Sequence, residues 1–291
     1  MRERLRALGP DLLRRLNRGI KKESLRVRPD GTLALTPHPV ALGSALTHES
    51  ITTDFSESQL ELITGVHQSI EGCLTELTRI HQAVYRALAA NDEMLWCSSM
   101  PCWLSDEAMI PLGQYGSSNV GLAKTVYRNG LAHRYGKRMQ MISGIHYNFS
   151  LPTEAWRAMD WAGGADDAYF ALLRNFRRHA WLCFYLFGAS PAVCPSFVGE
   201  GEPGARPHGL ERLQRKTLYL PHATTLRMGR LGYQSDAQSS IFASCNDLES
   251  YAAGLEPALI QSYAPYEKIG IRDPEGRGPA GGYRQLGTTL L

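Results

Sequence analysis

The sequence has few of the features that mark secreted, membrane-embedded or nucleic-acid-binding proteins. Its six cysteines include no CxxC pair, so we predict no disulfide framework and expect a cytoplasmic protein with free thiols. Residues 1–18 alternate arginine with leucine and show no apolar stretch of the kind found in secretory signals. The most apolar segment, residues 180–189, is about half of the ~20 residues that span a bilayer, so we expect a buried core segment and no membrane partner.

An excess of charge of one sign is also lacking. The chain has 31 Lys and Arg residues against 28 Asp and Glu residues, a formal net charge of +3. No run of basic residues is long enough for a nucleic-acid-binding arm, so we expect no nucleic-acid partner. The dispersed basic residues fit solvated surfaces together with a site for an anionic small molecule. With 291 residues, 43% of them hydrophobic, the chain can bury a substantial core in one or two domains.

Extended segments and long helices alternate irregularly, which favours an α+β fold over a doubly wound sheet. Residues 20–27 and 32–36 are predicted to form a hairpin around the turn at 28–31, because proline fixes φ there and glycine tolerates positive φ. Apolar residues at helical spacing from Val66 to Leu88 predict the clearest helix. Further helices are predicted at 12–16, 169–186 (largely buried) and 248–262, and a surface loop at 199–209.

Three segments carry candidate functional residues, and the first is the extended stretch 19–27. Side chains two apart share a face of a strand, so Lys21 and Glu23 point one way while Lys22 and Arg26 point the other. Taken alone, this segment favours an edge strand whose charged residues face water.

The second segment, residues 51–64, contains two carboxylates seven positions apart. Asp54 and Glu61 would share one face if the segment were helical. Carboxylate oxygens are ligands that Mg²⁺ prefers. A helix N-cap at Asp54 and a solvated Glu61 explain the same residues equally well.

The third segment combines residues 125–131 with 144–150, which mix tyrosine, arginine, histidine and asparagine at a density typical of a small-molecule pocket. Each of these residues taken singly also has a structural explanation, such as a buried tyrosine or a core histidine. The structural explanation is preferred for any one of them, and it accounts less well for all of them together.

Nine sequence blocks between about Gly19 and Leu291 resemble, in order and spacing, the N-terminal half of bacterial glutamate–cysteine ligases. The blocks are GI-x-x-ESLRV, LTPHP-x-ALGSALTH, ITTDFSE-x-x-LELIT, SMPC, QYGSSN-x-G, YRNGL, SGIHYNFSLP, YLFGASPA and LPHATTLRM. The resemblance implies a glutamine-synthetase-like antiparallel sheet flanked by helices. It also implies ATP-dependent ligation of the glutamate γ-carboxylate to cysteine, the first step of glutathione biosynthesis.

Site residues follow from the same resemblance. Glu23, Asp54 and Glu61 match carboxylates that hold Mg²⁺ (or Mn²⁺) on the phosphates of the co-substrate ATP. Four residues match positions around the cysteine pocket, two match further substrate contacts and one supports the active site; these are, in turn, Phe55, Tyr127, Arg128 and Leu131, then Arg227 and Tyr233, then His146. Arg227 and His146 are the expected catalytic residues.

Departures from the family pattern concern charge and length. Lys21-Lys22-Glu23 stands where the family typically has Glu-Arg-Glu, and Arg230 stands at a usual aspartate. An ammonium ~4 Å from a bound cation costs roughly 4 kcal/mol at an effective dielectric near 20. The sequence also stops at Leu291, before the family segment QIENE.

From these departures we expect residues 1–291 to form a single, incomplete catalytic domain. Such a domain would expose apolar surface and would not make γ-glutamylcysteine at a useful rate by itself. Two other functions stay open: a non-catalytic amino-acid-binding protein, and a carboxylate–amine ligase for another amine. The oligomeric state is not predicted.

Overall fold

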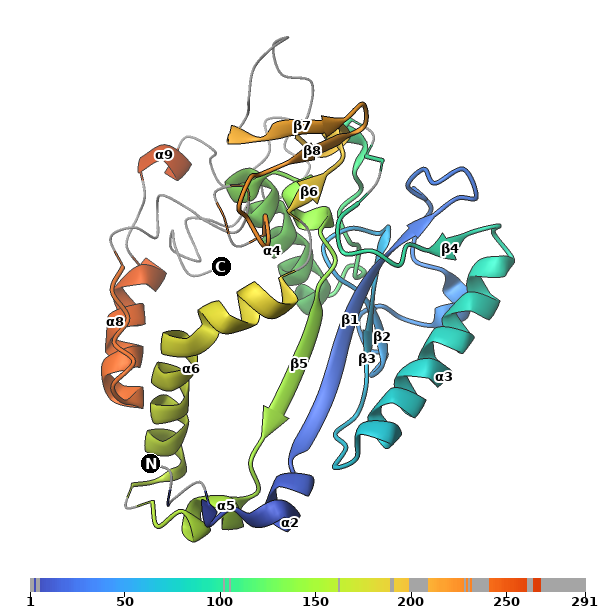
Figure 1. Cartoon of the computed structure of the whole chain (residues 1–291). Coiled ribbons are helices and arrows are strands. Elements are labelled where there is room, and N and C mark those ends of the chain that lie inside the picture. The colour runs from blue at the N-terminus through green and yellow to red at the C-terminus, as the bar shows by residue number, and fades with distance from the viewer. Residues whose placement is uncertain are drawn as a thin grey trace.

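The computed structural model describes residues 3, 6–101, 103–104, 106–161, 163–188, 191–198, 209–227, 229, 231, 241–260 and 264–267. Over these residues it has a five-stranded and a three-stranded sheet, both antiparallel, with helices around them (Figure 1). The predicted α+β class is confirmed. The predicted loop at 199–209 lies outside the described residues except for Gly209.

The larger sheet is built around one long strand. β1 (Asn17–Val27) pairs along one edge with β3 (Gln59–Ile63), which in turn pairs with β2 (Ile51–Thr53). β5 (Ile145–Ser150) pairs with the first half of β1, and β4 (Met94–Leu95) with its last two residues. The prediction of an edge strand is therefore wrong, because β1 has partners on both sides.

The predicted hairpin of residues 20–27 with 32–36 forms only next to its turn, where the amides of Arg28 and Ala34 donate to the carbonyls of Thr32 and Arg26. The turn forms as expected, with Gly31 at a φ of +81°, but only an isolated bridge joins Val27 to Leu33. Thr36 does not continue a ladder, because its carbonyl oxygen accepts a hydrogen bond from the Arg26 guanidinium at 2.5 Å. β4 pairs with the end of β1 along its opposite edge, where the Trp96 amide donates to the Leu25 carbonyl at 2.8 Å.

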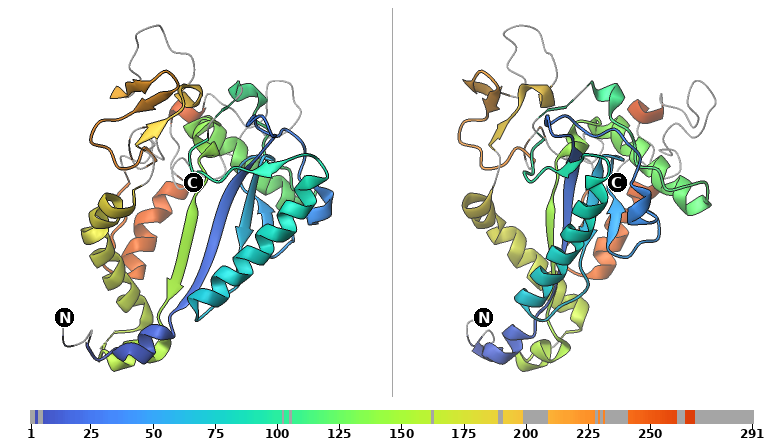
Figure 2. Two further views of the ribbon diagram at one scale, coloured as in Figure 1. Left: turned by 45° about the vertical axis from the view of Figure 1, so that its right-hand side comes forward. Right: turned by 90° about the vertical axis from the view of Figure 1, so that its right-hand side faces the viewer.

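One face of the larger sheet is covered by α3 (Ile70–Ala89) (Figures 1 and 2). The helix begins at Ser69, whose hydroxyl accepts a hydrogen bond from the Gly72 amide at 3.0 Å. Val66, predicted to lie in this helix, precedes it and is exposed. The buried face of the helix packs on apolar residues of β2, β3 and β4, and the core cluster contains Leu42, Ile51, Leu60, Leu62, Ile80, Val84, Leu88 and Leu95.

A second core joins the end of the larger sheet to α4 (Asn119–Tyr135) and to the smaller sheet of β6 (Ala192–Val193), β8 (Thr217–Tyr219) and β7 (Glu211–Gln214). The remaining elements are α2 (Gly9–Arg14), α5 (Thr153–Ala158), α6 (Ala165–Phe187), α7 (Pro195–Val198), α8 (Leu248–Ile260), α9 (Ala264–Glu267) and the short 3₁₀ turns Val40–Leu42, Glu107–Met109 and Met139–Met141. No helix among the described residues is long and apolar enough to cross a membrane.

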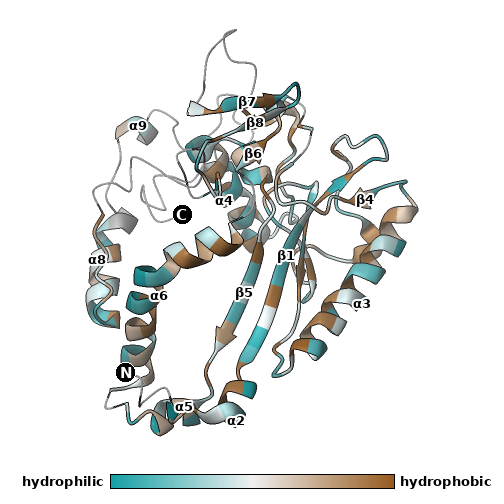
Figure 3. Ribbon diagram, viewed as in Figure 1, coloured by the Kyte–Doolittle hydropathy of each residue, from teal (hydrophilic) through white to brown (hydrophobic). Residues whose placement is uncertain are grey.

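Helix α6 forms where predicted but is not buried. Phe176, Trp181, Tyr185 and Phe187 are 57%, 63%, 72% and 79% exposed, and Figure 3 shows apolar residues recurring along the helix. Packing on α5 and α8 covers part of its first half, where the Phe170 ring lies 5.6 Å from the ring of Tyr251. The prediction of a buried segment at 180–189 is wrong for the residues described.

We expect this exposed surface of α6 to bind an apolar dye in the native state, because contiguous exposed aromatic side chains of this size are uncommon on soluble proteins. Changing both Trp181 and Tyr185 to serine should lower the fluorescence of bound anilinonaphthalene sulfonate by at least about half. Val40→Ser, which removes an isolated side chain that is 93% exposed, is the control and should leave the signal unchanged. Native protein that gives no dye signal above buffer would contradict the expectation.

Candidate active site

Three carboxylates meet on the face of the larger sheet opposite α3. Oxygen atoms of Glu23, Asp54 and Glu61 all lie within 4.8 Å of one another. They come from adjacent strands: Glu23 of β1 is directly opposite Glu61 of β3, and Asp54 follows the last residue of β2. Residues 51–64 thus form a hairpin and not the helix considered from the sequence. The structure brings the three residues together as predicted, and their role toward a metal stays a prediction.

Glu23 is held by β5 and by its own burial. Its carboxylate accepts a hydrogen bond from the Gly144 amide at 2.7 Å and lies 3.1 Å from Nε2 of His146. Burial, together with the nearby charge of Asp54, raises its pKa to about 7, against the opposing effect of the Gly144 amide and Arg227. A cation that approaches Glu23 therefore stabilises the ionised form of its carboxylate.

Glu61 forms an ion pair with Lys21 of the neighbouring strand. The Glu61 side chain is 8% exposed and that of Lys21 34%. Burial lowers the pKa of Lys21, but the hydrogen bond and charge of Glu61 outweigh this effect and the pKa is raised overall. Burial raises the pKa of Glu61 in spite of Lys21. Lys21 is therefore a cation fixed at the edge of the carboxylate cluster.

His146 and Arg227, the two expected catalytic residues, both lie beside Glu23. A Cβ atom placed on Gly144 would come within 2.9 Å of Nη1 of Arg227, 3.1 Å of Nε2 of His146 and 3.4 Å of the Glu23 carboxylate. Burial, with the charges of Lys21 and Arg227, lowers the pKa of His146. Gly144 leaves room for these three groups to converge, whereas a Cβ atom at this position would require the Arg227 and His146 side chains to shift.

Arg128 of α4 reaches back to the loop that carries Asp54. Its Nε donates to the Asp54 carbonyl, and its guanidinium carbon lies 4.3 Å from the centre of the Tyr115 ring. The Tyr115 hydroxyl donates to the same carbonyl at 2.8 Å. These contacts fix the main chain at Asp54, while the charge of Arg128 also acts on Glu61. Arg128 is thus joined to the cluster, and its role toward a substrate stays a prediction.

The other predicted substrate contacts are less directly placed. Phe55 and Leu131 are buried in the second core, and Tyr127 packs against that core from α4. Their roles toward a substrate stay predictions. Tyr233 and Arg230 lie outside the described residues.

Comparison with known proteins identifies the family of this chain. A family model described as glutamate-cysteine ligase matches residues 5–291. The chain belongs to the glutamate–cysteine ligase family. The ligases of Saccharophagus degradans and of Pseudomonas aeruginosa PAO1 are each 50% identical to it over 94% of its length, and the match spans 51% of each relative. The chain therefore spans about half the length of the curated relatives that it matches.

Solved structures agree with this family. The crystal structure of glutamate–cysteine ligase from Francisella tularensis in complex with AMP superposes with a TM-score of 0.82 at 39% identity, covering 91% of this chain and 52% of that one. A bifunctional glutathione synthetase from Pasteurella multocida gives a TM-score of 0.69 at 29% identity, covering 94% and 33%.

Two residues beside the carboxylate cluster were not singled out from the sequence. Tyr115 lies in the block QYGSSN-x-G and Gly144 in SGIHYNFSLP, but the blocks do not say which member supports the site. Tyr115 acts through a contact with Asp54, 61 positions away. Gly144 is explained only by the crowding of side chains from three separate segments.

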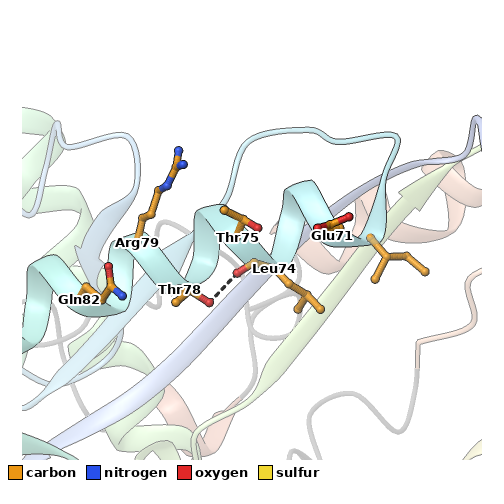
Figure 4. A pocket seen from close by; sticks show the side chains of 7 residues that line it. Glu71, Leu74, Thr75, Thr78, Arg79 and Gln82 are labelled. Carbon is orange, nitrogen blue, oxygen red and sulfur yellow. Dashed lines mark hydrogen bonds between the residues drawn. The ribbon is translucent and has the colours of Figure 1, made fainter.

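A hollow on α3 is separate from the carboxylate cluster. It measures about 610 Å³ and is lined by Ile70, Glu71, Leu74, Thr75, Thr78, Arg79 and Gln82. All of these belong to one helix, and Figure 4 shows their side chains spread along it without converging. The helix packs on the face of the sheet opposite the carboxylates, so this hollow does not open onto them.

His38 contacts the hairpin of β2 and β3 through Thr53, and it should make the free energy of unfolding depend on pH. Its Nδ1 lies 3.0 Å from the Thr53 hydroxyl, and Nε2 has no hydrogen-bond partner among the described residues. Burial, with the charges of Arg26 and His48, lowers the pKa of His38 to about 4. The main-chain amide of His38 donates to the carboxylate of Glu57, which lies between β2 and β3.

Because the folded pKa lies below that of the unfolded chain, the contribution of His38 to stability is complete above about pH 6.5 and is lost as the pH falls toward 4. After allowance for the partial exposure of His38 to solvent, we expect a loss of about 1–2 kcal/mol. His38→Asn keeps a partner for Thr53 without the titration, so its unfolding free energy should decline less over this range. Urea titrations at pH 7, 5.5 and 4.5 measure the difference, and parallel declines in both proteins would contradict it.

Proposed function

We propose that this chain provides part of the active site for ATP-dependent ligation of the glutamate γ-carboxylate to the amine of cysteine, the first step of glutathione biosynthesis. The observation that supports it most is the convergence of Glu23, Asp54 and Glu61 from three adjacent strands beside Arg128 and Arg227. The relatives named glutamate–cysteine ligase and the AMP-bound structure from Francisella tularensis make ATP the co-substrate to test. We further propose a cytoplasmic protein and one catalytic domain of glutamine-synthetase-like fold.

The carboxylate cluster fits a hard divalent cation such as Mg²⁺ or Mn²⁺, which takes oxygen ligands. Glu23 and Asp54 offer oxygens to such an ion directly, whereas Glu61 is shared with Lys21. A bound ion would neutralise the negative charge of the phosphates. The three carboxylates are thus of the ligand type that such a metal requires, but Glu61 is already paired with Lys21.

The chemistry assigned to the site has two steps. An oxygen of the glutamate γ-carboxylate attacks the γ-phosphorus of ATP, which forms γ-glutamyl phosphate and releases ADP. The cysteine amine then attacks the acyl carbon, the C–O bond to phosphate breaks, and the amine loses a proton as inorganic phosphate leaves. We assign to Arg227, beside Glu23, the binding of carboxylates or phosphate oxygens, because guanidinium groups bind both through paired hydrogen bonds. Arg128 would have to exchange its contacts with the carbonyls of Asp54 and Lys124 to do the same. We assign to His146, whose Nε2 lies 3.1 Å from the Glu23 carboxylate, the role of accepting the amine proton.

The test is phosphate release from ATP in the presence and absence of L-glutamate and L-cysteine. Because the chain spans half of its relatives, two proteins are assayed: the chain itself, and a hybrid in which it replaces the matching segment of the Saccharophagus degradans ligase. We expect the hybrid to release phosphate only with both amino acids, more slowly than the parent because of Lys21. A hybrid that folds but releases no amino-acid-dependent phosphate would overturn the proposal. Release with glutamate and a different amine would instead identify another substrate.

A further inference from the structure

The side chain of Lys21 enters the carboxylate cluster, whereas that of the adjacent Lys22 does not. It shares a face of β1 with Glu23, and its ammonium pairs with Glu61 on the adjacent strand. Lys22, the next residue, lies on the opposite face and donates to the Ser24 hydroxyl at 2.5 Å. One lysine of the pair therefore enters the carboxylate cluster and the other turns toward α3.

We propose that Lys21 is a built-in cation of the carboxylate cluster, which takes the place of a divalent ion at Glu61 and weakens metal binding there. The proposal rests on the proposed function in one respect, since it assumes that this cluster is the metal site. It has two consequences: the cluster needs no metal to remain folded, and a metal must displace the ammonium to gain Glu61 as a ligand.

The charges around the cluster support this assignment. Three carboxylates within 4.8 Å of one another repel strongly in a buried setting. Lys21 supplies a compensating charge on a tether of four methylene groups, so no ion has to be recruited from solution. That tether is flexible, and a lysine can swing out of an ion pair. We therefore expect divalent binding to be weakened and not abolished.

The experiment measures Mn²⁺ binding to the unmodified full chain by electron paramagnetic resonance, with the metal alone as the probe. Lys21→Gln should bind Mn²⁺ at least about tenfold more tightly than the wild-type chain. Without metal, Lys21→Gln should melt at a lower temperature than wild type, and Mn²⁺ should raise its melting temperature more. Lys22→Gln, with the same chemical change on the other face, should match wild type in both measurements. Lys21→Arg, which keeps the charge, should retain the weak binding.

Each alternative outcome has one meaning. If Lys21→Gln and wild type bind Mn²⁺ with equal affinity, and Asp54→Asn abolishes binding in both, then the cluster is a metal site and the assignment of Lys21 is overturned. If neither protein binds Mn²⁺, the metal site of the proposed function is overturned. If Lys21→Gln cannot be obtained folded without metal, Lys21→Met, which is neutral and unbranched, takes its place: tighter Mn²⁺ binding than wild type supports the assignment, and equal binding overturns it.

Discussion

Replacing Arg26 with alanine is expected to lower the free energy of unfolding by about 3–5 kcal/mol, a large share of the total for a typical protein. The Arg26 side chain is fully buried and lies 2.5 Å from the carboxylate of Glu93, which is 2% exposed. It also donates to the carbonyl oxygens of Thr36 and Glu57. Its removal leaves a buried carboxylate and several carbonyl groups without a partner, together with a cavity.

Urea denaturation measures this effect, and two further variants define its origin. Replacing both Arg26 and Glu93 with alanine should cost less than the sum of the single changes, because no unpaired charge remains. Arg14→Ala removes an ion pair with Asp11 whose side chains are 76% and 91% exposed, and should cost at most about 1 kcal/mol. An Arg26→Ala protein within 1 kcal/mol of wild type would show that the buried pair contributes little. If alanine prevents folding, Arg26→Lys gives a smaller loss with the same sign.

The largest expected effect on activity is that of Glu23→Gln in the hybrid ligase. We expect amino-acid-dependent phosphate release to fall at least about 100-fold, because a carboxylate that would offset cationic charge becomes neutral while its shape is kept. The amide oxygen can still accept the hydrogen bond from Gly144. Loss of charge also removes repulsion from Asp54 and Glu61, so the variant should be at least as stable as its parent without metal.

This opposite response of activity and stability separates a functional role from a structural one. A merely structural Glu23 would lower the melting temperature and the rate together. Glu71→Gln makes the same chemical change at an exposed position of α3 and should leave the rate unchanged. Retention of more than a tenth of the parental rate by Glu23→Gln would exclude the assigned role.

The sequence predicts those features that depend on local periodicity. The two-residue period of β1 correctly separates Lys21 and Glu23 from Lys22 and Arg26, and apolar spacing locates α3. Burial of Arg26 is not predictable in this way, because its partner Glu93 is 67 positions away and a charged residue in a strand is normally solvated. The same limit applies to α6, whose apolar composition predicts a core helix although few described elements pack on it.

For the site, a resemblance in sequence predicts which residues gather but not the contacts that arrange them. Asp54 and Glu61 are brought together by a hairpin, whereas their spacing of seven fits a helix equally well. The pairing of Lys21 with Glu61 depends on the register between β1 and β3. A one-residue shift of that register would turn every side chain of β3 to the other face.

The central place of β1 has a consequence for the motion of the site. Glu23 lies where β1 is joined on both edges, to β3 and to the segment leading into β5, and its own amide donates to the Gly144 carbonyl at 2.9 Å. A local fluctuation cannot expose that amide without parting β1 from this segment, so we expect slow hydrogen exchange that reports separation of these strands. Glu23 and Glu61 are thus preorganised by paired strands, and we expect a rearrangement that admits a ligand to come from the helices and loops around them.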